Sequence, residues 1–215
     1  MTTLTRPPLS TLLEQLFIDA DRTQATFRRG AGSAARPGGE DYKKFYTSAK
    51  DVYLAVSRET ATLLYMLVRH SNARNVVEFG TSFGISTLHL AAGVRDNGGG
   101  RVIGTEFEPS KVARARANMS AGGLADLVEI RDGDALETLA RDLPHSIDLV
   151  LLDGAKSLYL PVLALLEPKL RVGALIVADN ADMCPQYVER VRKPGGGYLS
   201  VPIQEDVELS LKLGE

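Results

Sequence analysis

Hydrophobic positions change their spacing along this chain near residue 74. Before that point, apolar residues recur at helical spacing, which predicts helices over residues 8–30 and 57–70 and a glycine-rich loop over residues 28–40. Ser57 is a suitable N-cap for the second helix. After that point, short apolar runs rich in β-branched residues predict five strands, at residues 75–79, 101–105, 127–130, 148–152 and 174–178.

Helical segments separate these strands, at about residues 85–95, 109–121, 135–141, 157–170 and 185–192. Near-continuous apolar strands that alternate with helices are typical of a parallel sheet covered on both faces. Two later runs, residues 198–202 and 208–213, predict a terminal antiparallel hairpin at one edge. We therefore predict an α/β, doubly wound, Rossmann-like fold with a mostly parallel seven-stranded sheet. Residues 51–215 would form this domain, and residues 1–50 an N-terminal helical extension and loop.

Composition narrows the class of partner. The chain has 215 residues, with 25 Lys and Arg against 27 Asp and Glu, and a formal net charge of -2. Balanced charge creates no global field toward a nucleic-acid backbone or an anionic membrane, so neither is expected as a partner. The single cysteine, Cys184, excludes an intrachain disulfide framework and a multi-cysteine metal site. We find no signal-peptide pattern and no apolar run of membrane-spanning length, so the expected location is cytoplasmic.

The turn after the first predicted strand has the composition of a ligand-binding loop. Gly80 and Gly84 frame it, and glycine lets the backbone approach a ligand while N–H groups at the helix start face that ligand. The turn departs from the GxGxxG dinucleotide fingerprint and is compatible with a purely structural role. Glu78 stands within the strand end, where a carboxylate would repel a diphosphate and favour a cationic amino acid.

Acids also follow the second and third predicted strands. Ligands of such sheets bind beyond the carboxyl ends of the strands, so these acids are candidates for ligand contact. Glu106, at the tip of the second strand, could accept hydrogen bonds from both hydroxyls of a ribose, or be a solvated surface residue. Asp134 could contact an adenine amino group or cap the helix that follows, and the two roles are compatible.

Two further carboxylates close the fourth and fifth predicted strands, at Asp153 and Asp179. Adjacent parallel strands lie about 4.8 Å apart, and two carboxylates that close repel each other unless a cation or a proton lies between them. With the amide oxygen of Asn180, they form an oxygen set that suits Mg²⁺ or a similar hard ion. The alternative is a helix cap at Asp153 and a turn at Asp179. Lys156, in the next loop, is either a general base or a solvated lysine.

Together these residues resemble the class I S-adenosylmethionine-dependent methyltransferases, and most closely the metal-dependent O-methyltransferases of the catechol and caffeoyl-CoA type. Residues 54–59 match that family's cofactor segment before the first strand. Residues 153–159 match its D-x-x-K-x-x-Y motif, and Asp179-Asn180 matches its D-N pair. The resemblance covers roughly residues 50–213, including the closing strand over residues 208–213.

The resemblance implies S-adenosylmethionine and Mg²⁺, or another hard divalent cation, as cofactors, and a homodimer. It implies Asp153, Asp179 and Asn180 as metal ligands, and Asp153 and Lys156 as catalytic residues, with Lys156 removing the proton of a hydroxyl in a small catechol-like or phenolic substrate. The implied cofactor contacts are Val56, Glu78, Gly80, Thr81, Ser82, Gly84, Ser86, Glu106, Phe107, Asp134, Ala135 and Asp153.

The chain departs from the family around the motif lysine. Gly154, Ala155 and Ser157 are small where the family carries larger or charged residues, and the chain has no tryptophan for an aromatic gate. We therefore expect substrate specificity to reside in residues 28–46. The alternatives are a metal-independent or macromolecule-directed methyltransferase, and a non-catalytic S-adenosylmethionine-binding protein.

Overall fold

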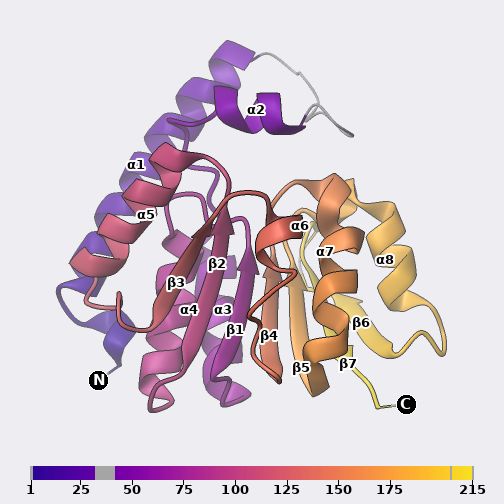
Figure 1. Ribbon diagram of the computed structural model, residues 1–215. Coiled ribbons are helices and arrows are strands. Elements are labelled where there is room, and N and C mark those ends of the chain that lie inside the picture. Colours follow the sequence, from indigo (N-terminus) through magenta and orange to yellow (C-terminus); the bar gives the residue numbers. More distant parts are fainter. Residues whose placement is uncertain (1, 32–41, 204, 215) are drawn as a thin grey trace.

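A computed structural model describes residues 2–31, 42–203 and 205–214, and its described residues form one seven-stranded sheet in the order β3-β2-β1-β4-β5-β7-β6 (Figure 1). The first five strands pair in parallel, whereas β7 is antiparallel to both of its neighbours. This confirms the predicted doubly wound α/β fold and its terminal hairpin. The strands are β1 Asn75–Phe79, β2 Arg101–Glu106, β3 Val128–Asp132, β4 Ile147–Leu152, β5 Leu170–Ala178, β6 Tyr198–Pro202 and β7 Glu208–Lys212.

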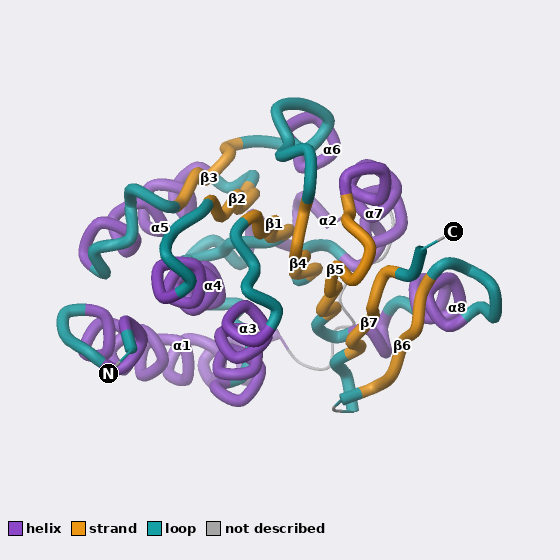
Figure 2. Tube along the Cα trace, turned by 90° about the horizontal axis from the view of Figure 1, so that it is seen from below, coloured by secondary structure: helices purple, strands orange, loops and turns teal. Residues whose placement is uncertain are grey.

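Helices cover both faces of the sheet (Figure 2). One face carries α1 Leu9–Ala31, α3 Arg58–His70, α4 Ile85–Asp96 and α5 Pro109–Ala121. The other carries α6 Ala135–Thr138, α7 Tyr159–Leu166 and α8 Pro185–Arg192. Successive strand side chains point to opposite faces, so Val76 joins the first hydrophobic cluster and Val77 the second. This two-sided burial is the reason why the strands read as continuous apolar runs.

The N-terminal helix is part of the core. Leu9, Leu13 and Leu16 of α1 are buried in the same cluster as the residues of α3, α4 and α5. The Ser57 side chain accepts a hydrogen bond from the Thr60 backbone N–H at 2.9 Å, which confirms the predicted cap of α3. None of the helices in the described part of the chain is long and apolar enough to cross a membrane.

Three predicted boundaries are wrong. The helix over residues 157–170 is divided into a short 3-10 turn Lys156–Leu158, α7, and a second 3-10 turn Glu167–Lys169, where Pro168 prevents α7 from continuing. Leu170 already belongs to β5. α1 continues to Ala31, so the first residues of the predicted 28–40 loop are helical, and the rest of that loop lies outside the described residues.

The third difference concerns α6, which ends at Thr138 although the sequence predicts a helix to residue 141. The guanidinium of Arg131, itself buried, donates to the carbonyls of Thr138, Arg141 and Asp142 at 2.5, 2.7 and 2.8 Å. These carbonyls therefore have a partner without a further helical turn. Among the described α-helices, α2 Tyr42–Ser48 was not predicted, and it lies above the carboxyl ends of the central strands in Figure 1.

Candidate active site

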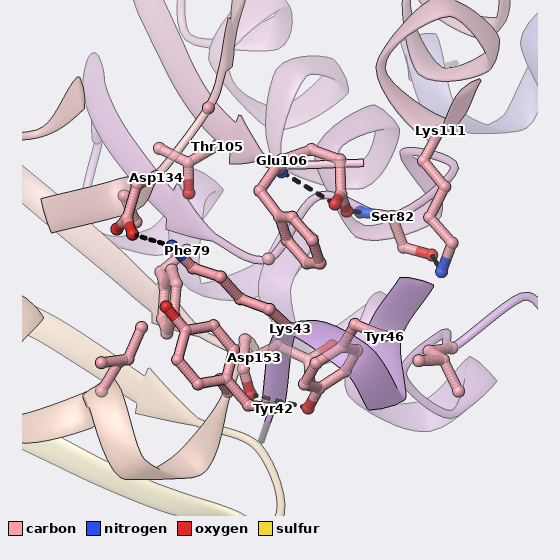
Figure 3. A pocket seen from close by; sticks show the side chains of 18 residues that line it. Tyr42, Lys43, Tyr46, Phe79, Ser82, Thr105, Glu106, Lys111, Asp134 and Asp153 are labelled. Carbon is pink, nitrogen blue, oxygen red and sulfur yellow. Dashed lines mark hydrogen bonds and ion pairs between the residues drawn. The ribbon is translucent and has the colours of Figure 1, made fainter. Parts of the chain in front are cut away.

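The candidate site lies where the strand order reverses. The chain proceeds outward from β1 to β3 and then returns to place β4 on the other side of β1, which leaves a crevice beyond the carboxyl ends of β1 and β4. A pocket of about 640 Å³, its open mouth included, occupies this position (Figure 3). Seven of the predicted cofactor contacts line it, namely Gly80, Ser82, Glu106, Phe107, Asp134, Ala135 and Asp153.

Gly80 allows the ends of β1 and β4 to meet. Its φ of +99° is in the left-handed region, and a Cβ atom there would lie 2.6 Å from the carbonyl oxygen of Asp153. The Asp153 N–H donates to the carbonyl of Phe79 at 2.8 Å, which extends the strand pairing to the last residue before the loop. A side chain at position 80 would therefore push Asp153 away from the cofactor loop.

Glu78 supports this loop from behind. The carboxylate is fully buried and accepts hydrogen bonds from the hydroxyls of Thr81 at 2.8 Å, Ser86 at 2.6 Å and Thr87 at 2.5 Å. Burial raises the pKa of Glu78 to about 7, although the three hydroxyl donors oppose this. Among the predicted cofactor contacts, the ones that are buried and do not line the pocket are Val56, Glu78, Thr81, Gly84 and Ser86. Direct contact of these five with a cofactor stays a prediction.

Glu106 occupies the pocket wall with its carboxylate fixed by the backbone. It accepts hydrogen bonds from the N–H groups of Ser82, Phe107 and Glu108, each at 2.9 Å. Burial raises the pKa of this carboxyl, whereas these donors and the charge of Lys111 lower it. Glu106 is therefore a positioned acceptor in a pocket and not a solvated surface residue.

Asp134 performs the capping role that the sequence allowed. Its side chain accepts from the Leu136 N–H at 3.0 Å at the start of α6. Its second oxygen pairs with the Lys43 ammonium at 2.8 Å, and the hydrogen bond from Lys43 is the main reason why the pKa of Asp134 is lowered. The suggested contact with an adenine stays a prediction.

Behind Asp153, Lys156 contacts both predicted metal-binding aspartates, although Lys156, Asp179 and Asn180 do not line the pocket. Its ammonium donates to Asp153 Oδ1 at 3.2 Å, to the Tyr159 hydroxyl at 2.7 Å and to the Asp179 carbonyl at 3.1 Å. Only 9% of the Lys156 side chain is exposed, so the solvated alternative for this lysine is wrong. Burial, and then the charge of Asp153, raise the pKa of Asp179 to about 8.

Asp153, Asp179 and Asn180 offer oxygen atoms of the kind that a hard divalent cation binds. Besides burial, the negative charge of Asp153 is one cause of the raised pKa of Asp179, and a cation or a proton near both carboxylates would relieve this repulsion. Asn180 follows with a left-handed φ of +51°, and its amide donates to Asp206 Oδ2 at 3.1 Å. No three His, Cys, Asp or Glu side chains that could hold a metal ion converge within the described residues, so metal binding by Asp153, Asp179 and Asn180 stays a prediction. Asp206 was not identified from the sequence.

The wall contributed by α2 was also missed. Tyr42, Lys43 and Tyr46 line one side of the pocket, across from Glu106 and Ser82 in Figure 3, and the Tyr46 hydroxyl donates to the Gly154 carbonyl at 3.4 Å. The aromatic and basic residues of this short segment were a signal, and the expectation that specificity lies within residues 28–46 pointed toward it. Sequence spacing could not show which part of the sheet such a short helix covers.

The fold is that of a Rossmann-like methyltransferase, and comparison with known proteins agrees. A family model described as a methyltransferase domain matches residues 77–181. A catechol O-methyltransferase from Mycobacterium tuberculosis is 37% identical over 127 residues, which are 59% of this chain and 57% of that protein. A catechol O-methyltransferase from Niastella koreensis is 32% identical over 130 residues, 59% of this chain and 58% of that protein. The match spans a little over half the length of these curated relatives.

Solved structures extend the similarity over nearly the whole chain. Cofactor-bound Rv0187 from MTB has a TM-score of 0.70 at 26% identity, covering 92% of this chain and 98% of that one. The O-methyltransferase TomG from Streptomyces achromogenes, in complex with SAM, has a TM-score of 0.64 at 25% identity, covering 91% and 99%. The chain therefore has a methyltransferase fold and is similar to O-methyltransferases of the catechol O-methyltransferase type.

Proposed function

We propose that this chain transfers a methyl group from S-adenosylmethionine to a hydroxyl of a small catechol-like or phenolic substrate, with the help of a divalent metal ion. The observation that carries the proposal is the continuity of one pocket. Its wall runs from Glu106 and Asp134, where a nucleoside would be held, to Asp153, which is hydrogen-bonded to Lys156. The two curated relatives described above are named catechol O-methyltransferases, which supports the same chemistry.

The residues of the pocket would divide the work. Glu106 would accept hydrogen bonds from the ribose hydroxyls, and the loop from Gly80 to Gly84 would position the amino-acid end of the cofactor. Lys156 would take the proton of the acceptor hydroxyl, because its amine lies beside the metal-ligating carboxylates in a mostly buried position. Tyr159 would hold that amine in place through its hydroxyl.

Asp153, Asp179 and Asn180 would hold the metal ion. When bound, the ion supplies positive charge that lowers the proton affinity of a hydroxyl and orients its oxygen. The protein's own contribution is then orientation, because the α2 wall and the small residues Gly154 and Ala155 together shape the space above Asp153.

The experiment is a methyl-transfer assay with labelled S-adenosylmethionine on catechols, hydroxycinnamates and hydroxycinnamoyl thioesters. We expect product from at least one of these acceptors in the presence of Mg²⁺, none in excess chelator, and recovery when Mg²⁺ is restored. Full activity in excess chelator would show that the enzyme is metal-independent.

Two other results would select the alternatives. Methylation of RNA or protein without methylation of any small phenol would indicate a macromolecule-directed enzyme. Tight cofactor binding without product on the whole panel would indicate a non-catalytic S-adenosylmethionine-binding protein.

A second copy of the chain is the macromolecular partner that we propose. Strand β6 forms one edge of the sheet, and its apolar side chains Leu199 and Val201 are 62% and 55% exposed. Exposed apolar side chains on an unpaired edge strand are typical of surfaces that pair with another chain.

A further inference from the structure

Lys111 is a buried cation in the pocket wall to which the proposed reaction assigns no role. It lies in the first turn of α5, lines the same pocket as Glu106, and only 2% of the residue is exposed. Within the described residues no carboxylate reaches ion-pairing distance of its ammonium, and its one side-chain hydrogen bond goes to Ser82 Oγ at 3.3 Å. A buried ammonium is costly, so its retention in this position calls for a specific interaction.

Lys111 is connected to Glu106 by hydrogen bonds through Ser82. The backbone of Ser82 is left-handed, with a φ of +48°, a conformation that costs a non-glycine residue free energy unless its surroundings hold it. Two hydrogen bonds hold it: the ammonium of Lys111 donates to Ser82 Oγ, and the Ser82 N–H donates to Glu106 Oε2 at 2.9 Å (Figure 3). The ammonium also lies 5.3 Å from the ring centroid of Phe83, the next residue in the loop.

The charge of Lys111 acts on Glu106 as well. Burial raises the pKa of the Glu106 carboxyl, and the positive charge of Lys111 opposes this. Burial lowers the pKa of Lys111, and the negative charges of Glu106, Glu108, Asp51 and Asp153 oppose that. Glu106 and Lys111 thus favour each other's charged forms across the pocket wall, although they are not in direct contact.

We propose that Lys111 is a positioning residue for the cofactor, which holds Ser82 in its left-handed conformation and keeps Glu106 ionised and aligned to accept the ribose hydroxyls. This inference rests on the proposed function, because it requires an adenosyl ligand in the pocket. Lys111 acts through Ser82 and Glu106 and does not touch the reacting atoms. A lysine that only packed its stem against Phe83 would show none of the electrostatic coupling described below.

The test measures binding of S-adenosylhomocysteine by calorimetry at mildly acidic, neutral and mildly alkaline pH. Lys111→Met keeps the length of the stem and removes the charge, Lys111→Arg restores the charge, and Ser82→Ala removes only the hydroxyl acceptor.

We expect Lys111→Met to weaken binding about tenfold at neutral pH, since a charge-assisted hydrogen bond is lost. The loss should be larger at mildly acidic pH, where removal of the Lys111 charge lets Glu106 take up a proton more readily than in the wild type, and smaller at alkaline pH, where Glu106 is ionised in both proteins. Lys111→Arg should recover most of the affinity, and Ser82→Ala should show part of the loss.

A double-mutant cycle with Glu106→Gln separates positioning from general destabilisation. In the Glu106→Gln background, Lys111→Met should cost clearly less than tenfold, about the loss shown by Ser82→Ala alone, because only the contact with Ser82 is left to lose. An undiminished loss in that background, or a loss that is the same at every pH, would overturn the inference. If the wild-type chain failed to bind S-adenosylhomocysteine, the proposed function itself would fail. Thermal unfolding of each variant verifies that it is folded.

Discussion

At the scale of single residues, the site depends on side chains whose polar atoms are almost fully occupied by partners. Lys156 shows this clearly, because its three donors reach a carboxylate, a phenol and a carbonyl. Tyr159 is fully buried, and its hydroxyl lies 2.7 Å from both the Leu152 and the Asp179 carbonyl, so it fixes the position of the amine. Such a network fixes the direction of the Lys156 amine.

Replacement of Lys156 tests its chemical role. Lys156→Ala should lower the turnover number by about a hundredfold or more, the usual contribution of a positioned base. The dissociation constant for S-adenosylhomocysteine should stay within a few-fold of the wild-type value, because Lys156 is not among the residues that line the pocket around Glu106 and Asp134. Tyr159→Phe is a milder control that keeps the lysine and removes one of its partners. Wild-type turnover in Lys156→Ala would exclude Lys156 as the base.

Glu78 makes stability depend on pH. The unfolded chain releases this proton near the ordinary value of 4.5, whereas the folded protein retains it up to about 7. The folded state therefore binds more protons in this window, so the free energy of unfolding falls as the pH rises from about 5 to about 8. Glu78→Gln carries no titrating proton and should lose about 2–3 kcal/mol less than wild type over this range.

Urea unfolding at the two ends of the range measures this difference. Asp179, whose pKa is raised to about 8, is present in both proteins, so its own contribution cancels in the comparison. Equal losses of stability in Glu78→Gln and wild type would contradict the assignment of this pH dependence to Glu78.

At the scale of secondary structure, α2 is the element that adds an unpredicted wall to the pocket. A helix of seven residues is too short to be stable alone, so its place depends on tertiary contacts. Tyr46 reaches the Gly154 carbonyl and Lys43 pairs with Asp134, which ties α2 to both ends of the pocket. The tyrosines of α2 supply aromatic surface in a chain that has no tryptophan.

Removal of the Tyr46 ring should therefore affect the acceptor more than the chemistry. We expect Tyr46→Ala to raise the KM for a phenolic acceptor roughly fivefold to tenfold, with a small change in turnover, because an aromatic contact is lost. Tyr46→Phe keeps the ring and loses only the hydrogen bond to Gly154, so its KM should stay near the wild-type value. An unchanged KM in Tyr46→Ala would show that α2 does not contact the acceptor.

At the scale of the whole molecule, one sheet face is unevenly covered. Strand register places Leu175, Leu211 and Leu199 in one row across β5, β7 and β6, and Val177, Leu209 and Val201 in the next. Val177 is buried, whereas Leu199 and Val201 on the edge strand are exposed. α8 covers the opposite face of these strands (Figure 2). The proposed homodimer would cover the exposed end of these rows.

Light scattering of purified variants tests this surface. If the chain is a homodimer that pairs through this face, Val201→Asp should shift the mass toward that of a monomer, because burial of a carboxylate in an apolar contact is costly. Ile18→Asp replaces another exposed apolar residue, on α1 at the far side of the molecule in Figure 2, and should leave the mass unchanged. A dimer that persists in Val201→Asp would exclude this face as the interface.

The sequence by itself determined the features that follow from local pattern. Apolar runs predicted the strands because a two-sided sheet requires them, and the acids at strand tips, such as Glu106, Asp153 and Asp179, were found because parallel strands end at a common edge. Helix ends were less predictable where a side chain from another element binds the last carbonyls of the helix, as Arg131 does at the end of α6. The boundary between residues 50 and 51 stays a prediction, although α1 shares the core of the domain.

Only the tertiary structure decided which residues meet. Tyr46 reaches Gly154, Lys43 reaches Asp134, and Lys111 reaches Ser82, although each pair is far apart along the chain. No periodicity records such contacts, because they depend on how loops and short helices pack above the sheet. The class of chemistry could therefore be inferred from the order of residues, whereas the shape of the pocket and the support of its cofactor loop depended on the three-dimensional packing.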